Sequence, residues 1–297
     1  MRGLVIGVGV LLGCALTAAG QETGIDDERQ ERLMERYEKM VNFNLKTDHA
    51  LPEGEIDSLM RSFEPLRLGD RIAAWADYFH QRGDAAYKFG LEEGGYAHDG
   101  RLVDDFSTDC ILFFYRVTEL GRSASALEAV QFAFGTRFYG ATLEEVVSED
   151  GRVDYDNPVH LDYSIDIIRS GIWGSEVTEH LGHLVRDMAG SSRYEKGTVR
   201  FVPTEKILFS SLRSGDIIFF VSNEETSSGR AVRESGAIIA HVGIVRVEDG
   251  EAYLIHPAAK PLPGVYEGGK VEKVLLKAYL RRIENFKGIK VCRVENF

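Results

Sequence analysis

Residues 236–257, GAIIAHVGIVRVEDGEAYLIHP, decide the fold that this chain of 297 residues is expected to adopt. Two short apolar runs, rich in β-branched residues, flank Asp249-Gly250, a dipeptide typical of a tight hairpin turn. The stretch therefore predicts two neighbouring antiparallel strands joined at residues 248–251.

This hairpin is expected to bring two histidines together. Alternation of side chains along its first strand places Ile239, His241 and Gly243 on one face. If residue 248 pairs with residue 251, Gly243 faces His256, and His241 is a diagonal neighbour of His256 on the same face. The pairing predicts two imidazoles within reach of each other.

Further short apolar runs follow residue 190, and turn residues separate them. They are TVRFV (198–202), GDIIFFVS (215–222), KVEKVLL (270–276) and GIKVCRVE (288–295). Strands in series without long intervening helices favour an antiparallel sheet, so the expected fold class is α+β. The polar segment 222–236 is expected to be a flexible hairpin loop near the rim of an active site.

Helical periodicity dominates the first part of the chain. We expect helices at 26–47, 55–63, 70–82, 110–121, 123–135, 162–170 and 175–189, and loops at 92–108 and 136–160. Ser123 is the expected N-cap of the helix 123–135, because its hydroxyl can accept from a backbone N–H. The helices before residue 92 form an N-terminal extension in this interpretation.

The first twenty residues have the pattern of an export signal. Arg2 precedes GLVIGVGVLLGCALTAAG (3–20), which carries no charge, and small residues suit cleavage after Gly20. Two alternatives are lipidation of Cys14 in Leu-Leu-Gly-Cys, and an uncleaved anchor at the lower length limit for a membrane span. All three predict a periplasmic or cell-envelope location, with membrane attachment only through Cys14 or an uncleaved signal.

Composition excludes several classes of function. The 47 acidic and 35 basic side chains give a net charge of -12, which disfavours binding to nucleic acid or anionic lipid. Three cysteines are too few for a dense disulfide scaffold, and the sequence contains neither a Cys-x-x-Cys pair nor a P-loop. We expect no cofactor and no metal.

Cys110 is the candidate nucleophile. It follows Ser107-Thr108-Asp109 and begins the helix 110–121. The peptide dipoles at a helix N-terminus are expected to lower the pKa of the thiol, and the free N–H groups there can stabilise an oxyanion. Two alternatives for this cysteine are a packing role and a disulfide with Cys292.

Taken together, Cys110, His241 and His256 satisfy the logic of nucleophile, base and orienting residue. A zinc site made by the same three side chains is the competing interpretation, although the sequence offers no fourth ligand at short spacing.

The order of these features resembles that of the NlpC-type cell-wall peptidases, a papain-like superfamily, and within it the N-acetylmuramoyl-L-alanine amidase-like group of unknown function. The similarity covers about residues 94–294. The motifs that carry it are Asp109-Cys110, FGTRF (134–138), Tyr163 with Asp166, GDII (215–218), His241-Val242-Gly243 and His256.

The resemblance implies a papain-like α+β core in which the nucleophile helix packs on an antiparallel sheet. It implies that Cys110 is the nucleophile, His241 the general base and His256 the orienting residue. Asp109, Tyr163 and Gly243 are expected to bind substrate.

The implied function is that of an exported, cysteine-dependent amidase or peptidase acting on peptidoglycan or muropeptides. The expected organisation is a signal peptide (1–20), an N-terminal helical extension (21–91) and an NlpC-like domain (92–297). Leu112 and Tyr115 stand where the group places Thr and Glu. A non-catalytic peptidoglycan-binding module on the same fold is therefore one alternative, and a thiol acyltransferase that uses the same nucleophile is another.

Overall fold

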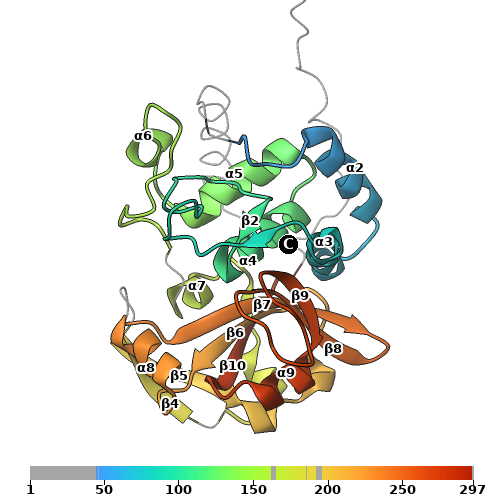
Figure 1. The fold of residues 1–297 in the computed structure, drawn as a ribbon, viewed down its shortest axis with the longest axis vertical. Coiled ribbons are helices and arrows are strands. Elements are labelled where there is room, and N and C mark those ends of the chain that lie inside the picture. The colour runs from blue at the N-terminus through green and yellow to red at the C-terminus, as the bar shows by residue number, and fades with distance from the viewer. Residues whose placement is uncertain (1–44, 46, 162–164, 185, 192–195, 296–297) are drawn as a thin grey trace, which may run out of the picture.

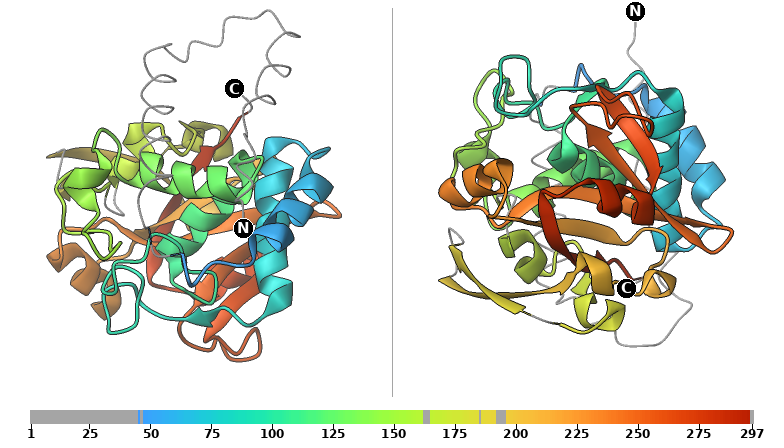
Figure 2. Two further views of the ribbon diagram at one scale, coloured as in Figure 1. Left: turned by 90° about the horizontal axis from the view of Figure 1, so that it is seen from above. Right: turned by 60° about the horizontal axis from the view of Figure 1, so that its bottom comes forward.

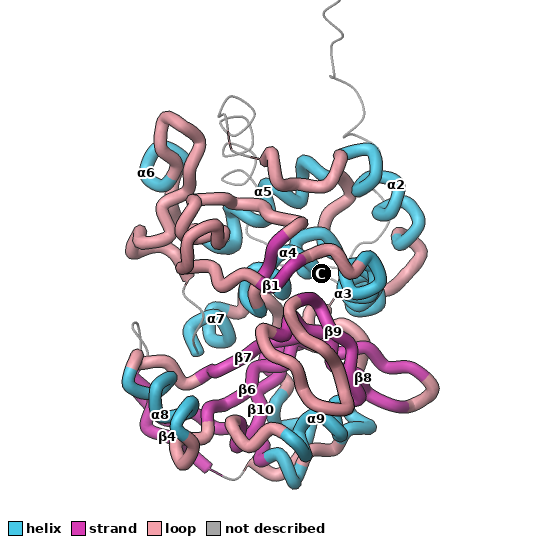
Figure 3. The backbone as a smooth tube through the Cα atoms, in the orientation of Figure 1, coloured by secondary structure: helices cyan, strands magenta, loops and turns pink. Residues whose placement is uncertain are grey.

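The protein is described by a computed structural model of residues 45, 47–161, 165–184, 186–191 and 196–295. The helices before residue 140 gather in one part of the molecule, and the strands after residue 216 form the other part together with two short helices (Figures 1 and 3). The expected signal segment and almost all of the expected helix 26–47 lie outside the described residues. No helix in the described ranges is both long and apolar enough to span a bilayer.

The helices are mostly those that the sequence predicts. They are α2 (Glu53–Phe63), α3 (Leu68–Arg82), α4 (Cys110–Arg122), α5 (Ala126–Arg137), α6 (Leu143–Val146), α7 (Ile165–Ser170), α8 (Ser227–Glu234) and α9 (Leu276–Arg282). Single 3₁₀ turns lie at Thr178–Leu181, Thr204–Lys206 and Phe209–Ser211.

The strands form one curled sheet. They are β1 (Ala86–Tyr87), β2 (Ser107–Thr108), β3 (Ser175–Glu176), β4 (Arg186–Ser191), β5 (Lys196–Pro203), β6 (Ile217–Ser222), β7 (Ile239–Glu248), β8 (Glu251–Ala258), β9 (Lys270–Leu275) and β10 (Phe286–Arg293). Their order is β2-β1-β9-β8-β7-β6-β10-β5-β4, and β3 also pairs with β10. All the pairings are antiparallel except that of β1 with β2, which confirms the α+β class.

Helix α4 covers one face of this sheet. Its apolar residues Phe113, Phe114 and Val117 belong to the same buried cluster as Phe219 of β6 and Val242 of β7. Seen from above, the green helices α4 and α5 lie over the orange and red strands (Figure 2). A second cluster fills the other face and includes Phe220, Leu254 and Tyr279.

The described part of the N-terminal extension shares the main hydrophobic core. A side chain at Gly121 of α4 would come within 2.6 Å of Ile72 of α3, so the two helices cross closely. Lys273 of β9 donates to Asp77 of α3 at 2.9 Å and to Glu248 of β7 at 2.8 Å. No break in packing therefore separates α3 from the sheet, whereas the domain boundary at residue 91 stays a prediction.

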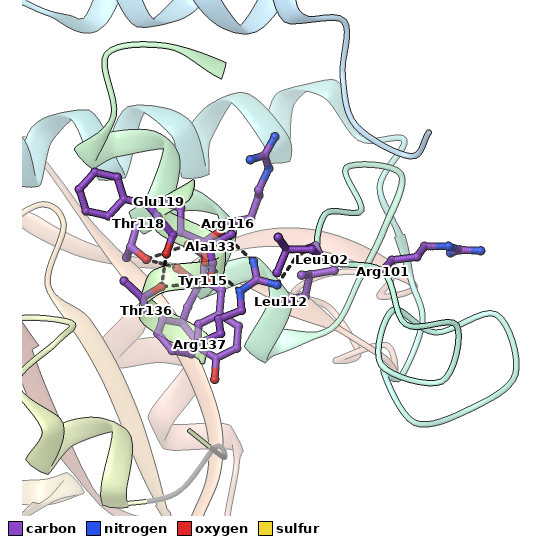
Figure 4. Close-up of polar contacts among 12 residues, drawn as sticks. Arg101, Leu102, Leu112, Tyr115, Arg116, Thr118, Glu119, Ala133, Thr136 and Arg137 are labelled. Atoms are coloured by element: carbon purple, nitrogen blue, oxygen red, sulfur yellow. Dashed lines mark hydrogen bonds and ion pairs between the residues drawn. The ribbon is translucent and has the colours of Figure 1, made fainter. Parts of the chain in front are cut away.

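The FGTRF motif provides a buried ion pair between α4 and α5 (Figure 4). Both Arg137 and Glu119 are almost completely buried, and Nε and Nη2 of the arginine donate to the two carboxylate oxygens at 2.8 Å. Arg137 Nη1 also donates to the carbonyl of Leu102 at 2.6 Å. In this structure the arginine of the motif holds helices together.

Two expectations about helices were wrong. The segment 175–189 contains β3, a 3₁₀ turn and the beginning of β4, because Val177 donates its N–H to Val291 of β10 and Gly182 has a φ of 152° that a helix does not allow. Ser123 ends α4, and Ser125 caps α5 by accepting from the N–H of Glu128.

Two expected loops contain helices. The segment 222–236 holds α8, whose N-cap Thr226 accepts from the N–H of Gly229. The segment 136–160 holds the single turn α6, which Thr142 and Glu145 close as a capping box. Local capping stabilises both turns without the long apolar periodicity that the sequence analysis relied on.

Candidate active site

Asp109 positions Cys110 at the first residue of α4. Its Oδ1 accepts from the N–H groups of Ile111 and Leu112, each at 2.9 Å, which is the N-cap arrangement. Its Oδ2 accepts from the N–H of Gly90 at 2.9 Å. One carboxylate thus fixes both the start of the helix and the loop after β1, while Cys110 remains partly exposed.

The two histidines meet as the hairpin predicts. Glu248 pairs with Glu251, and the register between β7 and β8 continues as expected. His241 Nε2 and His256 Nδ1 lie 2.8 Å apart, with ring centroids separated by 4.9 Å at an interplanar angle of 82°. His256 is buried and His241 is partly exposed.

A β-bulge corrects the expected alternation along β7. Phe220 of β6 pairs with His241, whereas the next residue, Val221, pairs with Ile239 two positions away, so Ala240 is the extra residue. Ile239 therefore joins the cluster under α4, whereas His241 packs beside Phe220 with a centroid separation of 5.7 Å. The bulge turns Ile239 to the face that α4 covers, while His241 keeps the expected face, which also carries His256.

Cys110 packs against the strand that carries His241. The backbone N–H of Val242, the residue after His241, faces the thiol and acts to lower its pKa. The hydroxyl of Tyr279 in α9 also lies in the electrostatic range of Cys110, and its ring is 5.0 Å from that of His256. Within the described residues the thiol forms no hydrogen bond with either histidine, so a site shared by Cys110, His241 and His256 stays a prediction.

The resting state of Cys110 is a neutral thiol rather than the expected thiolate. Burial, followed by the charge of Asp109, raises the pKa of the Cys110 thiol well above its ordinary value, and these effects outweigh the backbone N–H groups. Burial lowers the pKa of His241 to about 4, and burial, followed by the charge of His241, lowers the pKa of His256 well below its ordinary value. At rest the thiol and both imidazoles are therefore neutral.

Gly243 makes room for the histidine pair. A Cβ at this position would lie 2.5 Å from Leu254 Cδ1, 3.0 Å from the Ile255 carbonyl oxygen and 3.1 Å from His256 Cβ. The close approach of β7 to β8 therefore depends on glycine. The structure gives Gly243 a steric role, and its expected role in binding substrate stays a prediction.

The other two expected substrate-binding residues are placed differently. Both oxygens of Asp109 are occupied by backbone N–H groups, so its observed role is to cap and anchor. Tyr163 lies outside the described residues. Substrate binding by either residue stays a prediction.

Three tyrosines that the sequence analysis did not select line the site. Tyr279 and Tyr266 pack their rings 5.0 and 5.6 Å from the ring of His256. Tyr87 of β1 lies near the thiol, and burial, followed by the charge of Cys110, raises the pKa of its hydroxyl. No sequence signal pointed to any of the three, because the pairing that brings Tyr87 beside Cys110 joins two very short strands, one of them in a segment expected to be a loop.

Of the alternatives for Cys110, the packing role has direct support, because the side chain packs against the main buried cluster. Cys110 and Cys292 are both free thiols, and Cys292 is buried in β10. Within the described residues, no group of three or more His, Cys, Asp or Glu side chains converges to hold a metal ion.

Neither a sequence-family model nor a curated protein matches this chain. Solved structures do share its architecture. An N-acetylmuramoyl-L-alanine amidase from Bacteroides uniformis has a TM-score of 0.53 at 21% identity, over 77% of this chain and 99% of that one. A protein from Bacteroides fragilis proposed to be a xylanase has a TM-score of 0.52 at 21% identity, over 74% and 99% of the two chains.

A Legionella pneumophila protein of the family DUF1460 has a TM-score of 0.53 at 17% identity, over 82% of this chain and 94% of that one. The names of these proteins differ, and their identities to this chain are low. The likeness establishes that the chain has the same mixed α+β fold as these three proteins.

Proposed function

We propose that this protein is an exported cysteine amidase or peptidase that hydrolyses an amide bond in bacterial peptidoglycan. The observation that carries the proposal is the 2.8 Å contact between His241 and His256, together with a thiol at the start of α4, the helix that packs on β7. The name of the Bacteroides uniformis amidase supports the substrate class, although its low identity does not transfer the activity. The proposal includes a papain-like NlpC-type core.

The geometry supports general-base catalysis by neutral groups. Because His241 uses Nε2 to contact His256, its Nδ1 is the nitrogen left to accept the proton of Cys110. The sulfur then attacks the amide carbonyl, the amine leaves with a proton from His241, and water releases the acyl group. A His241 pKa near 4 keeps this base unprotonated at neutral pH.

Fewer backbone N–H groups are available to stabilise an oxyanion than the sequence suggests. Asp109 already accepts from the N–H groups of Ile111, Leu112 and Phe113, two through its side chain and one through its carbonyl. The N–H of Cys110 itself is therefore the helix donor that we assign to the oxyanion. One well-placed donor contributes about 10²–10³ in rate in comparable enzymes.

The test is hydrolysis of purified peptidoglycan and defined muropeptides, with products identified by mass spectrometry. Cys110→Ala should abolish cleavage, while Cys292→Ala, which removes the other described thiol, should retain it. Cleavage by Cys110→Ala at the wild-type rate would show that the mechanism is wrong. Wild-type binding without cleavage would favour the non-catalytic wall-binding module, and transfer of an acyl group to an added lipid acceptor would favour the acyltransferase.

A further inference from the structure

A buried carboxylate lies on the strand next to His256. Glu272 of β9 pairs directly with His256 of β8, and residues paired in this way project their side chains from the same face. The side chain of Glu272 is buried, and its Oε1 accepts from the N–H of Gly268 at 2.9 Å. The mechanism described above makes no use of this group.

Tyr266 lies near both the carboxylate and the imidazole. Its ring lies 5.6 Å from that of His256, at an interplanar angle of 72°. Burial, followed by the charge of Glu272, raises the pKa of the Tyr266 hydroxyl to about 12. Because the charge of Glu272 affects the Tyr266 hydroxyl and the Tyr266 ring packs near His256, the three side chains form one cluster.

His256 has an open hydrogen-bonding position in this cluster. Its Nδ1 contacts His241, whereas its buried Nε2 has no hydrogen-bond partner in the described structure. Buried polar atoms without partners are rare, and each asks for an explanation.

The shared proton between the two histidines has two arrangements. In the first, His241 donates from Nε2, its Nδ1 is a lone pair that can accept the thiol proton, and His256 carries its own proton on Nε2. In the second, His256 donates from Nδ1, His241 carries a proton on Nδ1, and it cannot act as a base toward Cys110. Only the first arrangement supports catalysis.

We propose that Glu272 is a positioning residue that holds the proton on Nε2 of His256 and thereby keeps His241 in the arrangement that can accept the thiol proton. A carboxylate favours the ring edge that bears an N–H and disfavours the edge that bears a lone pair. The inference rests on the proposed function, because it assigns His241 as the base. The groups that face His256 are His241, Glu272, Tyr266 and Tyr279, and no cation is among these four.

The first experiment measures the imidazole tautomers by ¹⁵N–¹H NMR at neutral pH in the wild-type protein. The expected result is a proton on Nε2 of His256 and a bare Nδ1 on His241. A proton on Nδ1 of His256 would overturn the proposal, whatever any variant does. Neither the tautomer measurement nor the alkylation of Cys110 uses peptidoglycan. A failure to hydrolyse peptidoglycan would therefore reject the proposed function without deciding the role of Glu272.

The second experiment is alkylation of Cys110 by iodoacetamide between pH 5 and 9. In this reaction the sulfur displaces iodide, and the thiol proton goes to His241. Glu272→Gln keeps an oxygen that can accept from Gly268 but removes the charge, and it should slow alkylation at pH 7 about tenfold, a fraction of what a full general base contributes.

Glu267→Gln is the matched control, because it removes an exposed carboxylate from the same β8–β9 connection. It should alkylate at the wild-type rate. Glu272→Asp, which retains the charge, should stay closer to wild type than Glu272→Gln. If Glu272→Gln folds and alkylates like wild type across the pH range, the carboxylate does not position the histidines.

Discussion

Adding one methyl group at Gly243 tests whether the histidine pair depends on the close approach of β7 to β8. In Gly243→Ala the new Cβ would lie 2.5 Å from Leu254 Cδ1, 3.0 Å from the Ile255 carbonyl oxygen and 3.1 Å from His256 Cβ. Carbon atoms in contact prefer about 3.5–4.0 Å. The leucine methyl can rotate away, but the backbone oxygen and the β-carbon of His256 cannot.

The strands must therefore separate by several tenths of an ångström at His256. Overpacking of this kind costs about 1–3 kcal/mol of unfolding free energy, which for a chain of this size lowers Tm by roughly 3–9 °C. The displacement falls on the 2.8 Å contact between His241 and His256. Misplacement of catalytic groups by about 1 Å can cost about 10²-fold in rate, so we expect a loss of activity between tenfold and that limit.

Thermal unfolding and the rate of Cys110 alkylation measure the two effects separately. Gly54→Ala is the matched control, because a Cβ there meets nothing within 4 Å and alanine favours the helix α2. It should leave Tm unchanged or raise it slightly. A Gly243→Ala protein with the Tm and alkylation rate of wild type would refute the assignment of Gly243 as a spacer.

Two further predictions concern charge. Burial lowers the pKa of His241 to about 4, whereas an ordinary histidine has a pKa of about 6.5. Between about pH 4 and pH 6.5 the unfolded chain therefore binds more protons than the folded one. The stability that this residue contributes, up to about 3 kcal/mol, is complete above pH 6.5 and is lost as the pH falls toward 4. Urea unfolding from pH 4 to 7 should show a shallower loss in His241→Asn, and parallel curves for the two proteins would contradict the shift. Arg137→Met leaves Glu119 buried without its partner, and it should cost about 3–5 kcal/mol, whereas Arg137→Met combined with Glu119→Leu should recover most of this loss. Urea unfolding measures both, and a single variant that loses under about 1 kcal/mol would show that the pair is not buried as described.

The sequence predicted the hairpin and the meeting of its histidines because the local rules agree there. Asp249-Gly250 determined the turn, the turn determined the register, and the register made His241 and His256 diagonal neighbours. The start of α4 was equally accessible, since an Asp before an apolar helical run is a local capping signal.

The elements that escaped prediction depend on distant partners. The segment 175–189 has helical spacing in sequence, but its backbone pairs with β10, more than a hundred residues later. The bulge at Ala240 appears only in the pairing of β7 with β6. Glu272 and Tyr279 are ordinary residues of a strand and a helix, and only the curled sheet brings them beside His256.

Under the proposed function, the protonation state of Cys110 affects how readily the thiol is oxidised. Oxidation of cysteine, like its alkylation, proceeds through the thiolate, and burial with Asp109 keeps the thiol protonated at rest. A neutral imidazole whose pKa is about 4 does not pull the proton away before substrate arrives. Charge would then develop only as the sulfur attacks, where the N–H of Cys110 and the carboxylate of Glu272 can stabilise the developing oxyanion and imidazolium. In the proposed mechanism the thiolate forms only during attack on the substrate. The resting thiol should therefore oxidise more slowly than a thiol on an unfolded chain.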